Sequence, residues 1–524
     1  MKHLLITKLF LFILIHATTQ EKPNILWLVC EDQSLFFPQY GDSLAKTPNI
    51  NQLSNEGIVY DNFYAVSPVC APSRSSIITG MYPTTIGTQH MRAYKKIENN
   101  KNNISYPSYS ASPNKKVQFF TEILRLNGYY CTNNSKEDYN MLMSPLAWDE
   151  SSRTAHWKNR KKNQPFFAVF NFSSTHESKI WGNERQHSKE EISKVKLPPF
   201  YPNNDAIKND FVTNYKNIER LDSLIGKIII QLKQDNLYNN TIIFFYSDHG
   251  GPFPRYKRSI YDTGIKCPLI IKWNKKPNKK RNNQMISFID LAPTVLDLSD
   301  CNTPDNIEGI SFYNQNKRKY IYAATDRFDE YTDKRRCIRS DSFKLILNCD
   351  TSSPIMKPVK YRKKMATMKL LDSLHLENKL NMSMNDWYNS FKNKYELYDI
   401  INDPNELYNL FGNKKYDTVF NELKQELFSW KESSDFGDMN ELEMIDKMLN
   451  HGMKHVLNEP ELETIQNGFK IKSNNLNSSV GWRKMGAEKW EIYNGNIIEP
   501  GNNFETIIFK PGYEILHKSY FKNK

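Results

Sequence analysis

The run Asn24-Ile25-Leu26-Trp27-Leu28-Val29-Cys30 is apolar at nearly every position, and Glu31 and Asp32 follow it directly. A strand with one solvated face would alternate apolar and polar residues. This continuous run therefore predicts a strand buried on both faces, as in a parallel sheet covered by helices. Residues 166–172 and 241–246 have the same character. Together they predict an α/β fold with a large mixed, mostly parallel sheet flanked by helices.

Each of these three runs ends in polar side chains that could bind a ligand. Glu31 and Asp32 follow the first run, His176 follows the second, and Asp248 and His249 follow the third. Open α/β sheets place their sites at the carboxyl ends of the strands, so we expect these side chains to converge. Carboxylates with an imidazole form an oxygen-rich site, which favours calcium over transition metals. Taken alone, either acidic pair has a simpler explanation as a turn or a helix cap.

A second informative segment is Cys70-Ala71-Pro72-Ser73-Arg74, which precedes Ser75-Ser76-Ile77-Ile78-Thr79-Gly80. The two serines of the latter suit the N-terminus of a short helix, and its glycine suits the end. A helix N-terminus favours an anion, and the Arg74 guanidinium has a fork geometry that suits a tetrahedral oxyanion. The segment thus combines a nucleophile, an anion-binding turn and a cation. The alternative is an inert, buried cysteine beside a turn.

The pattern Cys-x-Pro-Ser-Arg, followed by a small-residue helix and Thr-Gly, resembles the signature of type I sulfatases, and the resemblance extends from about Pro23 to Leu410. It implies an alkaline-phosphatase-like fold and hydrolysis of sulfate esters. It also implies bound Ca²⁺ and oxidation of Cys70 to formylglycine (3-oxoalanine) by a formylglycine-generating maturation enzyme. Family members usually carry Asp-Asp where this chain has Glu31-Asp32, and many carry asparagine at 249. The implied metal ligands are Glu31, Asp32, Cys70, Asp248 and His249.

The resemblance also implies a mechanism. The metal and Asp248 would ionise one hydroxyl of hydrated formylglycine 70, which attacks sulfur in line, and the sulfated hydrate would collapse to aldehyde and sulfate. Family members carry Lys-x-His where this chain has Lys136-Glu137-Asp138, so the base of the recovery step stays open. The residues implied to act on the sulfate are the cations Arg74, Lys136 and Lys257 and the proton donor His176.

The substrate is less closely defined by the sequence. Phe253-Pro254 after Ser-Asp-x-Gly, together with the Glu-Asp pair, resembles bacterial polysaccharide sulfatases and sulfamidase-like members more than arylsulfatases. We therefore expect a sulfated polysaccharide or oligosaccharide, with N-sulfoglucosamine as the second choice. Some residues could contact a second anionic group or line a sugar cleft, although packing explains each more simply. They are His90, Arg92, Trp148, His156 and Trp157.

Other functions stay open at this point. One is a phosphonate or phosphodiester hydrolase of the same superfamily, which can also use formylglycine. Another is a glycan-binding protein in which Cys70 remains a thiol. A binding protein has no need for a metal site and a nucleophile together, so the combination of motifs favours the enzyme.

Charge and composition limit the classes of binding partner that we expect for this protein. The 524 residues carry a net charge of +13 and the pI is about 9.0, which suits polyanions such as sulfated glycans. The sequence has no helix-turn-helix, zinc-finger or RNA-binding signature, so we expect no nucleic-acid partner. No cysteine spacing suits a structural zinc.

The N-terminus has the features of a secretory signal peptide. A charged start is followed by an apolar run from Leu4 to Ile15 and by Ala17. The run is too short for a membrane span. The sequence predicts a signal peptide over residues 1–17, no membrane span in the mature chain, and a secreted or periplasmic protein.

The remaining sequence predicts three parts. Residues 22–330 would form the catalytic sulfatase domain. Residues 331–435 would form a smaller C-terminal α+β subdomain with an antiparallel sheet, since residues 395–399 (Tyr-Glu-Leu-Tyr-Asp) resemble that part of sulfatases. Residues 463–520 contain short β runs and would form a small accessory β module.

Overall fold

The computed structural model of the protein describes residues 22–521, except 94–96, 100–103, 107, 114–115, 182–185, 274–279, 314–316, 390, 450–454, 467 and 500–502. The expected signal peptide lies outside these residues. Within the described part of the chain, no helix is long and apolar enough to cross a membrane. All seven cysteines are free thiols.

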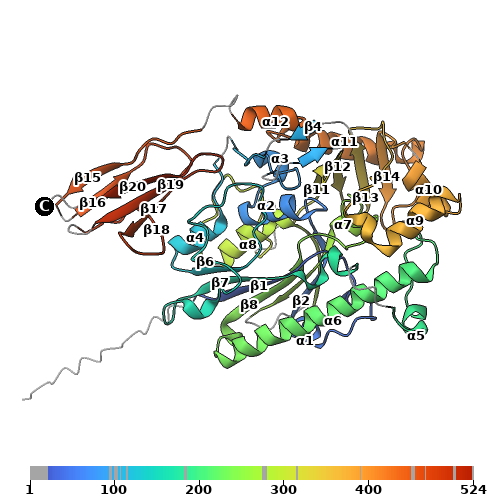
Figure 1. Ribbon diagram of the computed structural model, residues 1–524, viewed down its shortest axis with the longest axis horizontal. Helices are drawn as coiled ribbons and strands as arrows, with labels where there is room; N and C mark the ends of the chain where they lie inside the picture. The colour runs from blue at the N-terminus through green and yellow to red at the C-terminus, as the bar shows by residue number, and fades with distance from the viewer. Residues whose placement is uncertain are drawn as a thin grey trace, which may run out of the picture.

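An eight-stranded sheet carries the fold, in the order β10-β2-β9-β8-β1-β7-β5-β6 (Figure 1). Every pairing in it is parallel except those of β9 with β8 and β2, which are antiparallel. The mixed, mostly parallel sheet is therefore confirmed. Its strands are β1 (Asn24–Cys30), β2 (Gly57–Tyr64), β5 (Tyr130–Asn134), β6 (Glu150–Ser151), β7 (Phe166–Phe172), β8 (Thr241–Ser247), β9 (Lys266–Lys272) and β10 (Arg281–Ser287).

Helices cover both faces of this sheet, as the continuous apolar runs required. Leu26 and Leu28 of β1 belong to one buried cluster with α1 and α6, while Trp27 and Val29 belong to another with α2, α4 and α8. Figure 1 shows these two sets of helices on opposite sides of the strands. Their bounds are α1 (Pro48–Glu56), α2 (Cys70–Thr79), α4 (Phe120–Leu126), α6 (Asp205–Gln234) and α8 (Leu291–Leu298).

Helix α2 differs from the sequence expectation at its start. The serines were expected to begin it, but the helix begins at Cys70, and Val69 is its N-cap. Pro72 is tolerated because the first turn of a helix has N–H groups without intrahelical partners. Gly80 ends the helix with a φ of 67°, in the left-handed conformation that glycine favours. Cys70 therefore occupies the N-terminus itself.

The C-terminal part contains two further four-stranded sheets. One has the order β11-β12-β13-β14 and is wholly antiparallel, as expected; the other has the order β18-β17-β19-β20 and lies at one end of the molecule (Figure 1). Their strands are β11 (Ile321–Phe328), β12 (Tyr331–Arg339), β13 (Phe343–Asn348), β14 (Tyr395–Asp399), β17 (Ser479–Lys484), β18 (Glu491–Ile492), β19 (Phe504–Phe509) and β20 (Leu516–Tyr520). The other elements are β3 (Ile97–Asn99), β4 (Ile104–Tyr106), β15 (Glu461–Ile465), β16 (Gly468–Lys472), α3 (Pro83–Ile86), α5 (Lys189–Ser193), α7 (Asp262–Ile265), α9 (Ala366–Leu376), α10 (Met382–Asn389), α11 (Asp417–Glu432) and α12 (Glu441–Met448).

The terminal strands are attached to the large sheet's helical layer. Arg125 of α4 donates a hydrogen bond of 2.7 Å from Nη2 to the Trp490 carbonyl oxygen. Phe509 of β19 belongs to the same buried cluster as Phe119, with ring centroids 6.3 Å apart. Polar and apolar contacts both hold these strands against α4.

The central strand provides a test of this fold. Leu28 is fully buried, so Leu28→Ala should lower the free energy of unfolding by about 2–5 kcal/mol through lost burial and a residual cavity. Denaturant unfolding followed by circular dichroism measures the change. The matched control Ile230→Ala, at an exposed position of α6, should change it by less than about 0.5 kcal/mol. Equal losses in the two variants would contradict the core described above.

Candidate active site

Four neighbouring parallel strands, in the order β8-β1-β7-β5, end at the same edge of the large sheet. The chain beyond each carboxyl end carries polar residues that the sequence analysis singled out. β2, further along the sheet, leads into α2 and Cys70. The sheet thus brings together Asp248 and His249 after β8, Glu31 and Asp32 after β1, His176 after β7, and Lys136 after β5.

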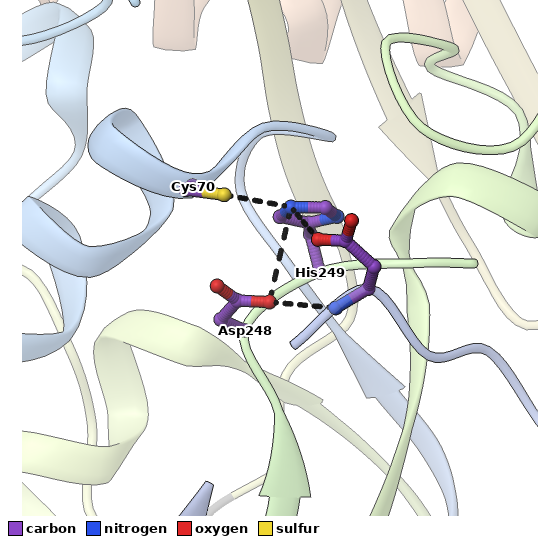
Figure 2. A group of neighbouring side chains, drawn as sticks. Cys70, Asp248 and His249 are labelled. Carbon is purple, nitrogen blue, oxygen red and sulfur yellow. Dashed lines mark hydrogen bonds and ion pairs between the residues drawn. The ribbon is translucent and has the colours of Figure 1, made fainter. Parts of the chain in front are cut away.

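The centre of the site is a buried group of four side chains: Asp32, Cys70, Asp248 and His249. One ligand atom from each lies within 4.8 Å of the others. His249 Nε2 is 3.3 Å from Cys70 Sγ, 3.2 Å from Asp32 Oδ1 and 3.8 Å from Asp248 Oδ1. Figure 2 shows the Cys70 sulfur, the His249 ring and the Asp248 carboxylate directed toward one another.

The donors of this cluster fit a divalent cation. The His249 Nδ1 lies 2.9 Å from the Gly250 carbonyl oxygen, so it donates there and leaves Nε2 facing the cluster. Asp32 Oδ1 is buried and accepts no hydrogen bond of good geometry. Burial would lower the pKa of His249, yet Asp248, Cys70 and Asp32 raise it to about 10. The carboxylates therefore place negative charge around the His249 ring, where a bound cation could take the place of the Nε2 proton.

Arg74 is fixed by the cluster. Its Nε and Nη2 donate to Asp248 Oδ2 at 3.1 and 3.0 Å, and Nη1 donates to Asn171 Oδ1 at 2.7 Å. Burial alone would raise the pKa of Asp248, but the neighbouring His249 and Arg74 hold it well below its usual range. Asn171 was not among the predicted site residues. Its sequence signal was a single polar residue in the otherwise apolar strand β7.

Lys136 lies on one side of the cluster. Its Nζ donates to Glu31 Oε2 at 2.8 Å and is 4.0 Å from Asp248 Oδ2. Glu31 is outside the group of four, and it forms a second possible ligand group with Asp32 and His176. The side chain of Lys136 is 21% exposed, so this side of the site is open to solvent.

Lys257 also lies beside the cluster. Its Nζ is 2.8 Å from Asp32 Oδ2, 3.2 Å from Glu177 Oε1 and 3.4 Å from His176 Nε2. Burial raises the pKa of Asp32, but Lys257 and the neighbouring histidines more than offset this and hold it well below its usual range. The two ring nitrogens of His176 face different groups: Nδ1 lies 2.9 Å from the Ser178 hydroxyl oxygen, and Nε2 lies 3.4 Å from the Lys257 ammonium. Burial and the neighbouring Lys257 lower the pKa of His176.

The sequence analysis missed the residues that hold Lys257. Glu177 contacts it and accepts two hydrogen bonds of 2.8 Å from the Arg258 guanidinium, which also pairs with Asp329. Both Glu177 and Arg258 are buried. Each directly follows a predicted site residue, and this adjacency was the available signal.

The residues considered for substrate contacts have different environments. His90 is buried, and its Nδ1 accepts from the Arg327 backbone N–H at 3.1 Å. Arg92 is partly exposed and lies 3.7 Å from Asp138, the residue at the position of the family histidine. Trp157 is fully buried against Phe166.

Trp148 is also buried, stacked on Phe167, and His156 lies against the rings of Trp157 and Phe170. Packing, the explanation that the sequence favoured for both tryptophans, agrees with the structure, because both belong to the buried clusters around the large sheet.

Known protein families and individual proteins match this chain in sequence. The family model described as Sulfatase matches residues 23–301, and the model for the C-terminal part of N-sulphoglucosamine sulphohydrolase matches residues 252–354. An ulvan-active sulfatase of Formosa agariphila is 38% identical, with 94% of this chain and 90% of that protein covered. The human N-sulphoglucosamine sulphohydrolase is 21% identical, with 78% and 89% covered.

Solved structures agree on the fold. An enzyme in complex with its substrate D-glucosamine-2-N,6-O-disulfate superimposes with a TM-score of 0.57 at 19% identity, covering 80% of this chain and 100% of that one. The family match, the 38% identical relative and the shared fold lead to one conclusion. The chain belongs to the sulfatase family of sulfuric ester hydrolases, as its cysteine motif predicted.

Proposed function

We propose that this protein removes sulfate from a sulfated polysaccharide or oligosaccharide, using formylglycine at position 70 and one bound Ca²⁺. The observation that carries the proposal is the buried group Asp32, Cys70, Asp248 and His249, located at the N-terminus of α2. The 38% identical relative is named as ulvan-active, which supports a polysaccharide as substrate.

The cluster supports this pair of cofactors chemically. Ca²⁺ prefers oxygen ligands, and a thiolate at position 70 would be a soft ligand in an otherwise hard site. Conversion of Cys70 to a formylglycine hydrate replaces that sulfur with oxygen. Asp32, Asp248 and His249 would hold the metal with it. When bound, the metal and the hydrate together supply an ionised oxygen nucleophile for attack on sulfur.

The other residues of the site have roles that follow from their positions. Lys136 and Lys257 both lie beside the cluster, where their ammonium groups can bind sulfuryl oxygens and stabilise charge in the transition state. Arg74 orients Asp248 through its two hydrogen bonds. His176 lies beside Lys257; when its ring is protonated to the imidazolium, Nε2–H can give a proton to the leaving oxygen and leave a neutral imidazole.

N-sulfoglucosamine is a second candidate substrate. The match of residues 252–354 to the C-terminal part of N-sulphoglucosamine sulphohydrolase favours it specifically. The same residues would serve, since His176 can protonate a leaving nitrogen as well as a leaving oxygen. We also propose that the chain is exported, on the evidence of its N-terminal sequence.

The first test is sulfate release from ulvan, other O-sulfated polysaccharides and N-sulfated heparin fragments. Enzyme co-expressed with a maturation enzyme should release sulfate. Cys70→Ala should reduce the rate by at least about a thousandfold, because only binding and charge stabilisation remain without the nucleophile. Mass spectrometry of the peptide that contains position 70 establishes conversion.

The matched control for that test is Cys349→Ala, at the exposed cysteine, which should keep the native rate. Phosphate release from phosphonate and phosphodiester substrates, in place of sulfate release, would contradict the proposal.

Metal binding can be measured without an activity assay, through the melting temperature of the protein. Ca²⁺ should raise the melting temperature of the chelator-treated protein, by an amount that corresponds to about 2.7 kcal/mol at a hundred times Kd. Asp32→Ala should abolish this shift because it removes a ligand of the cluster. Asp341→Asn, at an exposed position, should preserve the shift. A melting temperature indifferent to Ca²⁺ in the converted native protein would refute the metal site.

A further inference from the structure

The segment Lys357-Pro358-Val359-Lys360-Tyr361-Arg362-Lys363-Lys364 has no role in the function described so far. Five of its eight residues are cationic and none is acidic. It connects β13 with α9. A run of charges like this usually forms a solvated surface, so whether the segment has a function depends on where it lies in the fold.

The segment is anchored at the active site. Val359 belongs to the same small buried cluster as Cys70. Arg362 is buried, donates from Nη2 to the Lys357 carbonyl oxygen at 3.0 Å, and lies 5.4 Å from the centroid of the Trp387 ring. Val359 and Arg362, together with the buried Lys357, thus fix the backbone. The outward-facing residues are Lys360, Tyr361, Lys363 and Lys364, all of which are exposed.

Tyr361 lies beside the proposed proton donor. Its ring centroid is 6.5 Å from that of His176. Trp181, from another part of the chain, packs edge-on against Tyr361 with centroids 5.1 Å apart and an interplanar angle of 79°. Lys364 Nζ is 5.5 Å from the centroid of the Tyr361 ring. Tyr361 is nevertheless 37% exposed, so an aromatic surface faces solvent next to His176.

We propose that these residues form a subsite for the sugar chain on the leaving-group side. The group that His176 protonates is the sugar oxygen, so the sugar must lie on the His176 side of the sulfate. There the C–H face of a sugar ring can stack on Tyr361, supported by Trp181. Lys360, Lys363 and Lys364 would then meet sulfate or carboxylate groups of the adjoining sugars. This inference rests on the proposed function and specifies its substrate as an extended polyanionic chain.

Binding tests the subsite without catalysis. Unconverted protein, with a thiol at position 70, is titrated with ulvan and with heparin at low and high salt. Tyr361→Ala should weaken binding about threefold to tenfold, the range expected for loss of one aromatic contact. Lys360→Gln/Lys363→Gln/Lys364→Gln should weaken it at low salt and flatten its salt dependence, because salt screens exposed charges.

Matched controls separate the subsite from general surface effects. Tyr408→Ala removes another exposed tyrosine, and Lys379→Gln/Lys414→Gln/Lys415→Gln removes the same charge elsewhere. Both should bind like native protein, and all variants should show the native melting temperature. Equal losses in the control and subsite variants, or no binding of either polymer by native protein, would overturn the subsite.

Kinetic measurements on the converted enzyme provide a second test of the subsite. Tyr361→Ala should raise KM for the polymer more than for the shortest sulfated fragment that is hydrolysed, with little change in kcat. Unchanged KM for both would overturn the subsite while the sulfatase function stands. Polymer binding that depends on Tyr361 without any sulfate release would support the subsite and contradict the proposed function.

Discussion

Compensation of buried charge is the constraint on which the rest of this site depends. Asp32 and Asp248 are fully buried at the carboxyl ends of adjacent strands, where an unpaired charge would cost several kcal/mol. Lys257 pairs with the first at 2.8 Å and Arg74 with the second at 3.0 Å. The fold can bury two carboxylates beside Cys70 because α2 and the loop after β8 each bring a cation to them.

This compensation also determines the chemistry. Each cation leaves one oxygen of its carboxylate directed to the cluster: Lys257 and Arg74 contact the Oδ2 atoms, while the Oδ1 atoms face His249. The two Oδ1 atoms thus stay available to a metal, and Lys136 and Lys257 lie beside them, where an incoming sulfate group could bind. The same ion pairs therefore hold the structure together, prepare a metal site and form an anion-binding surface. Glu177 and Arg258 extend the network and orient Lys257.

Much of this arrangement could be predicted from the sequence where local pattern decides the structure. The run Asn24–Cys30 forms a strand with those bounds, and the convergence of Asp32, Asp248 and His176 follows from the rule for parallel strands. The start of α2 could not be predicted, because Val69 caps it without a side-chain hydrogen bond. Packing was the simpler explanation for Trp148 and Trp157, and both are buried. Asn171, Glu177 and the segment 357–364 needed contacts between distant parts of the chain.

The most direct test of the central claim is a crystal structure of the converted protein grown with Ca²⁺. The account predicts one ion bound by oxygens of Asp32, Asp248 and residue 70, at distances of about 2.3–2.6 Å, and by Nε2 of His249. Anomalous scattering identifies the metal. An empty cluster, or an ion bound elsewhere while Asp32 and Asp248 keep only their pairs with Lys257 and Arg74, would contradict the account.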